Sequence, residues 1–126
     1  MSQDRKKELA PKIKDILKGY CLKGSLSVQH HSTLVLNITE GEIDFCKNFN
    51  ETASERTRDA EGYIQVNHYW YHRHFSGIAK DVLKRLIDAM NIGNHNNSRP
   101  EIDYFDIGWY IDINIGKWNK PYKVVA

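Results

Sequence analysis

The sequence predicts an α+β domain in which two helices pack on one face of a four-stranded, mainly antiparallel sheet, in the chain order α-β-β-β-α-β. Two observations lead to this fold class. Apolar residues recur at the helical period over residues 3–20 and 77–91, and they alternate with polar residues over 25–38 and 104–115. The 126 residues suffice for one hydrophobic core but are few for two, so residues 1–126 are expected to form a single domain.

The first helix is predicted over residues 3–20. Its apolar stripe falls on one face and consists of Leu9, Ile13, Ile16, Leu17 and Tyr20. Pro11 has no amide hydrogen, so it either lies near the start of a regular helix or kinks a longer one. Two alternating runs follow, joined by residues 30–32, and they predict a hairpin over 25–38 with one buried face.

The next part of the chain has no clear period. Residues 43–49 are apolar at Ile43, Phe45 and Phe49, which fits either one helical turn or an irregular strap. Residues 50–62 contain no large apolar side chain, so they are predicted to be a surface-loop insertion. A short Gly-Ser linker is expected to replace this loop with little effect, because the entropy of loop closure changes slowly with loop length.

A third strand is predicted at residues 63–67, and a second long helix at 77–91 with Ser76 as its N-cap. The last strand is predicted over 104–115, where alternate residues, Trp109 and Ile111 among them, face the core. The opposite face of this strand is rich in tyrosine and acidic or amide side chains. Its members are Tyr104, Asp106, Tyr110, Asp112 and Asn114.

The charge of the chain is nearly balanced, with 18 basic and 16 acidic residues and a net charge of +2. Residues 1–24 are more basic, with seven basic and three acidic side chains, hence a net charge of +4. A basic helix attracts phosphate because binding releases counterions, so a nucleic-acid-binding accessory protein that uses the first helix is one alternative function. A solvated helix face is the simpler interpretation, since proteins that bind nucleic acid through bulk charge are usually far more basic.

The sequence indicates a soluble cytoplasmic protein with no membrane partner. No signal peptide opens the chain, and no run approaches the roughly 18 apolar residues of a membrane span. Cys21 and Cys46 do not form a CxxC pair, and their aromatic and aliphatic neighbours suggest small buried hydrophobes in a reducing compartment.

The densest group of candidate functional residues is the run His68–Phe75, which contains three histidines and four aromatic residues. His68 and His72 would share a helix face, a spacing that can chelate a transition metal. The run contains no Asp, Glu or Cys to complete a ligand set, so neither a bound metal nor a cofactor is predicted. Exposed amphipathic aromatic side chains are typical of binding surfaces, which makes His68, Tyr69, Tyr71 and His72 candidate binding residues.

The outward face of the last strand completes the predicted binding surface, with Tyr104, Asp106, Tyr110 and Asp112 as its candidates. Asp106 and Asp112 are separated by about 20 Å along a strand, too far for paired acid–base catalysis. No nucleophile elbow, phosphate-binding loop or dinucleotide fingerprint occurs, and no catalytic residue is predicted. A small hydrolase or nuclease that combines His68, His72, Asp106 and Asp112 across neighbouring strands is the alternative to a binding module.

Several phrases of the sequence resemble a family of small uncharacterised proteins of tailed bacteriophages and mobile elements. They are LKGYCLKGSLSV, STLVLNI, YIQVNHYWY and DYFDIGWYIDINIGKWNKPY. The family resembles in turn one of the large polyvalent-protein-associated domains. The resemblance implies expression in an infected bacterial cytoplasm and an accessory role in conflict with the host, and it brings no catalytic residues with it. Together with the residues above, it predicts a non-enzymatic phage accessory protein that binds a host or phage macromolecule.

Overall fold

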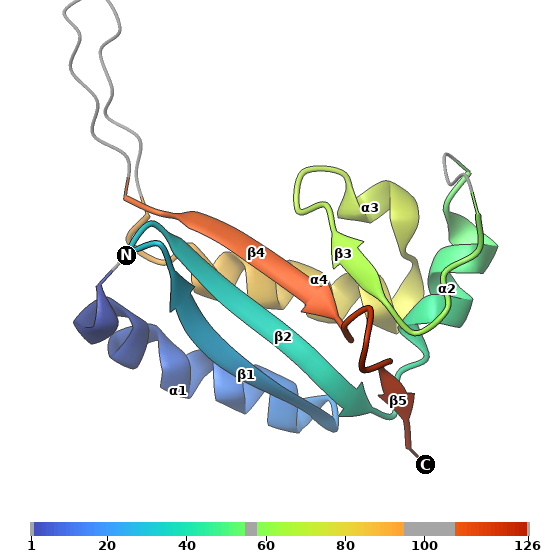
Figure 1. Ribbon diagram of the computed structural model, residues 1–126, viewed down its shortest axis with the longest axis horizontal. Helices are drawn as coiled ribbons and strands as arrows, with labels where there is room; N and C mark the ends of the chain where they lie inside the picture. Colours follow the sequence, from blue (N-terminus) through green and yellow to red (C-terminus); the bar gives the residue numbers. More distant parts are fainter. Residues whose placement is uncertain (1, 55–57, 95–107, 126) are drawn as a thin grey trace, which may run out of the picture.

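The computed structural model describes residues 2–54, 58–94 and 108–125, in which helices cover one face of a single sheet (Figure 1). The elements in chain order are α1 (Gln3–Gly19), β1 (Leu22–Gln29), β2 (Thr33–Gly41), α2 (Phe45–Thr52), β3 (Ile64–Val66), α3 (Tyr71–His74), α4 (Gly77–Met90), β4 (Tyr110–Ile115) and β5 (Lys123–Val124). The α+β class is confirmed, as are the two long helices and the hairpin.

The sheet is mixed and has five strands, which corrects the prediction of four mainly antiparallel strands. Its order is β1-β2-β4-β3, and β5 pairs with β2 beyond the end of β4. The pairs β1–β2 and β3–β4 are antiparallel, whereas β2 runs parallel to both β4 and β5. The alternation of apolar and polar residues could not predict the strand directions. It indicates which face of the sheet a side chain occupies, but it does not depend on whether the neighbouring strand is parallel or antiparallel. Strand β5 has only two residues, too few to alternate.

Helices α1 and α4 pack against the same face of the sheet and against each other (Figure 1). Helix α1 continues through Pro11. Of the two alternatives predicted for this proline, the longer helix with Pro11 inside it is therefore the one that forms. Its buried residues are Leu9, Ile13 and Leu17, part of the predicted stripe. The sheet contributes alternate residues of its central strands, which are Leu34, Leu36 and Ile38 from β2 and Ile111, Ile113 and Ile115 from β4.

The start of β4 is fixed by two sets of hydrogen bonds. The indole nitrogen of Trp109 donates to the carbonyl of Met90 at 2.9 Å, and Trp109 is 7% exposed, as its predicted inward orientation requires. The side chain of Asn94 bonds both the amide and the carbonyl of Trp109. Among the described residues the strand begins at Tyr110, and residues 104–107 of the predicted strand lie outside the described part of the chain.

The segment 50–62 begins inside helix α2, which corrects the N-terminal boundary of the predicted loop. Ala53 is 1% exposed, and the side chain of Asn50 bonds the backbone of Ala60, accepting from its amide at 2.6 Å and donating to its carbonyl at 3.1 Å. These contacts tie the two ends of the segment together, so replacing all of 50–62 by a Gly-Ser linker is expected to lower stability rather than to have little effect. That the segment is an insertion stays a prediction.

Replacing Asn50 by alanine is expected to lower the free energy of unfolding by about 1–3 kcal/mol, because the half-buried backbone groups of Ala60 lose their partners. Urea unfolding measures the change. Asn119 lies on the groove described below and is exposed, so Asn119→Ala is the matched control with an expected change below about 0.5 kcal/mol. Equal stability of the two variants would mean that the hydrogen bonds between Asn50 and Ala60 contribute nothing to the free energy of unfolding.

Candidate functional site

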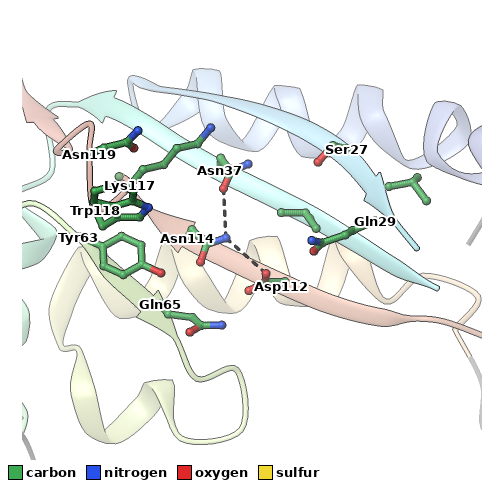
Figure 2. A pocket seen from close by; sticks show the side chains of 13 residues that line it. Ser27, Gln29, Asn37, Tyr63, Gln65, Asp112, Asn114, Lys117, Trp118 and Asn119 are labelled. Carbon is green, nitrogen blue, oxygen red and sulfur yellow. Dashed lines mark hydrogen bonds between the residues drawn. The ribbon is translucent and has the colours of Figure 1, made fainter. Parts of the chain in front are cut away.

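The face of the sheet opposite α1 and α4, called the open face below, carries a row of amide side chains across three neighbouring strands. Asn37 of β2 pairs in register with Asn114 of β4, which pairs with Gln65 of β3. The amide nitrogen of Asn114 donates to the side-chain oxygen of Asn37 at 3.1 Å and approaches the carboxylate of Asp112 at 3.5 Å (Figure 2). Asparagine and glutamine each have hydrogen-bond donors and acceptors, so this row can both donate hydrogen bonds to a polar ligand and accept them from it.

A groove of about 450 Å³ runs over this row and is called the groove below. Its floor includes Ser27, Gln29, Asn37, Gln65, Asp112 and Asn114, which come from β1, β2, β3 and β4. Its remaining lining includes Tyr63 and the residues Lys117, Trp118 and Asn119 of the turn after β4 (Figure 2). The described lining therefore combines a mainly polar floor, with Val28 and Val35 as its aliphatic members, and two aromatic rings.

The turn that carries Trp118 is held firmly although its tip is exposed. Lys117 and Lys120 exchange two backbone hydrogen bonds, of 2.9 and 3.1 Å. On the far side of the turn, the amide of Tyr122 donates to the carbonyl of Gly62 at 2.7 Å. The hydroxyl of Tyr122 donates to the carbonyl of Ile43 at 2.8 Å, and burial raises the pKa of this hydroxyl, which therefore keeps its proton. Trp118 is 85% exposed on this fixed support.

Two of the four candidates predicted on the last strand lie on the open face. Asp112 is half-buried in the groove, and Tyr110, 57% exposed, pairs in register with Thr33 of β2. Tyr104 and Asp106 lie outside the described residues.

The four candidates of the aromatic run divide between two surroundings. His68 is half-buried in the turn after β3, where burial lowers its pKa and the negative charge of Asp112 acts in the opposite direction. Tyr69 is 73% exposed, and its ring lies 4.1 Å from that of His68. Tyr71 and His72 belong to α3, where Tyr71 packs against the core and His72 is exposed. His68 thus lies within the electrostatic reach of Asp112, and Tyr71 lies away from the predicted surface.

Asp112 is the one predicted site residue in the described lining of the groove, and Asn37, Gln65 and Trp118 are among those that were not predicted. Asn37 and Gln65 had a signal, because alternation in the hairpin and in the third strand places both opposite the apolar face. Trp118 had no signal in the sequence beyond its residue type, because its position depends on the turn between β4 and β5, which both pair with β2.

Within the described ranges, no three His, Cys, Asp or Glu side chains gather closely enough to hold a metal ion. No helix in the described part of the chain has the length and apolar character needed to cross a membrane. Lys7 and Lys14 are exposed, and they belong to α1, which lies on the helix-covered side of the sheet, opposite the groove.

No family model, curated protein or solved structure matches this chain.

Proposed function

We propose that the chain is a non-enzymatic module that binds a host or phage macromolecule on its open face. The observation that carries the proposal is the groove, to which four strands and one turn contribute polar side chains beside two exposed aromatic rings. Tyrosine and tryptophan are enriched in binding surfaces, because they offer a large contact area at a low cost in conformational entropy.

The make-up of the groove supports binding rather than hydrolysis. Among its described lining residues, Asp112 is the one carboxylate and no histidine is present, although His68 lies near enough to respond to its charge. General acid–base chemistry needs titratable groups within hydrogen-bond reach of one substrate. The hydrolase or nuclease alternative also needs Asp106, which lies outside the described residues, and His72, which lies on α3.

The biological setting is part of the same proposal. The resemblance of four sequence phrases to small phage and mobile-element proteins supports an accessory role in the cytoplasm of an infected bacterium. In that setting the macromolecule on the open face would be a component of the phage or of its host.

The proposal is tested by capture from a lysate of phage-infected bacteria, with bound protein and nucleic acid both identified. The double variant Tyr63→Ala with Gln65→Ala is expected to lose the captured partner, because both side chains line the groove. Lys7→Gln with Lys14→Gln is expected to keep it, because both side chains lie on α1. Unchanged urea unfolding midpoints would show that both variants fold. Loss of the partner from the α1 variant alone would overturn the proposal.

A further inference from the structure

The groove and its surroundings differ in charge, and this difference indicates the chemistry of the ligand. The groove lining contains one acidic and one basic residue, Asp112 and Lys117, so it is close to neutral. The stretch 117–123 that contains the exposed turn is different, since it has three lysines and no acidic residue. In the described part of the chain, no salt bridge involves these lysines. A ligand that suits both regions has a neutral polar part for the floor and an anionic part for the turn.

The two exposed rings add a requirement for flat ligand groups. Trp118 and Tyr63 both line the groove, and both also line a neighbouring hollow of about 500 Å³ whose charged residues are Arg58, Asp59 and Glu61. The rings therefore separate two recesses, and because the far one has two acidic side chains and one basic side chain, the anionic part of a ligand is favoured on the lysine side. An 85% exposed tryptophan contributes little to the core, and its free ring is suited to stacking on a planar group.

Resting on the proposed binding function, we propose that the ligand of the groove is a single-stranded nucleic acid. Its bases stack on Trp118 and Tyr63. The edges of the bases contact the side-chain amides of Asn37, Asn114 and Gln65, because asparagine and glutamine form hydrogen bonds with base edges. Its phosphates lie toward Lys117 and Lys120. A duplex does not fit this arrangement, because its base faces are stacked within the helix and closed to protein rings.

The lysines also favour nucleic acid over the other ligands that an amide-lined groove can accept. A neutral saccharide would use the amides and the tryptophan but would leave three lysines in seven residues without a role. A nucleic acid would use the lysines, the aromatic rings and the amides together. Neutralisation of its phosphates supplies affinity, while stacking and amide contacts hold the bases.

The test measures the affinity of the purified full chain for fluorescent oligothymidylate, oligouridylate and a duplex of equal length. Trp118→Ala is expected to weaken single-strand binding by roughly 5- to 150-fold, the value of one stacked base, and Trp118→Phe to restore most of it. Lys117→Gln with Lys120→Gln is expected to lower the slope of log affinity against log salt by about 0.7 for each phosphate that the variant no longer neutralises. Lys7→Gln with Lys14→Gln is the matched control and should change neither quantity. The two single strands distinguish RNA from DNA.

Three outcomes would overturn the inference: duplex binding as tight as single-strand binding, affinity that salt does not change, and full affinity in Trp118→Ala. If no oligonucleotide binds while the groove is still required for capture from the lysate, this inference fails and the proposed binding function stands. If the α1 variant loses both the oligonucleotide and the captured partner while the groove variants keep them, both proposals fail.

Discussion

Replacing Ile113 by alanine is expected to lower the free energy of unfolding by about 2–5 kcal/mol, the usual range for truncating a buried aliphatic side chain. Ile113 is 1% exposed and lies in β4, between Leu36 of β2 and Val66 of β3. Neighbours on both sides prevent the strand from closing the space that the missing methyl groups would leave. Ile111→Ala on the same face is expected to fall in the same range.

Urea unfolding checks this result, and Gln65→Ala is the control from the same sheet. Gln65 is exposed on the open face, so its truncation should change stability by less than about 0.5 kcal/mol. A loss for Ile113→Ala as small as the control's would show that the assignment of inward and outward faces in β4 is wrong.

The second large effect is expected at Gly116, where alanine should cost about 2–5 kcal/mol through backbone strain and steric overlap together. Gly116 has a φ of +70°, a conformation that L-residues with a Cβ rarely adopt. An added Cβ would also overlap the carbonyl oxygen of Gly62 and the amide of Tyr122, the two groups whose hydrogen bond anchors the turn. We therefore expect Gly116→Ala to displace Trp118 and to weaken ligand binding as well as stability.

Gly19→Ala is the matched control, since a Cβ there meets nothing within 4 Å. Its expected effect on stability is below about 1 kcal/mol, because Gly19 is at the end of α1 and alanine is the better helix former. Chemical denaturation of both variants gives the comparison. A Gly116→Ala protein as stable as the control would mean that the turn has room to rearrange without loss.

Much of the fold could be predicted because the central elements have a clear period. The stripe of α1 and the alternation through Trp109 and Ile111 mark their buried faces, and the structure buries them. The strand directions could not be predicted in the same way, since β2 would alternate identically beside a parallel or an antiparallel neighbour. Strand β5 is defined by its pairing with Glu40 and Gly41 and has no local signal of its own.

The candidate site was predictable where it depends on alternation and unpredictable where it depends on pairing. Asp112 and Tyr110 face outward by their position in an alternating strand, and the structure places them on the open face. The position of Tyr71 could not be predicted from its neighbours, because the short helix α3 turns it toward the core although the residues on either side are exposed. Trp118 reaches the groove only because β4 and β5 both lie beside β2.

The parallel pairing of β2 with β4 has a consequence for how the chain folds during its synthesis. The hydrogen bond between Asn37 and Asn114 joins residues 77 positions apart, so the centre of the sheet is built from an early and a late part of the chain. Contacts of such long range slow folding, because the chain must close a large loop before it gains the pairing energy. On the ribosome, which adds about 5–20 residues per second, the β1–β2 hairpin emerges several seconds before its partner. Until then one edge of β2 has unpaired backbone N–H and C=O groups, which can pair with another chain and which chaperones shield from aggregation.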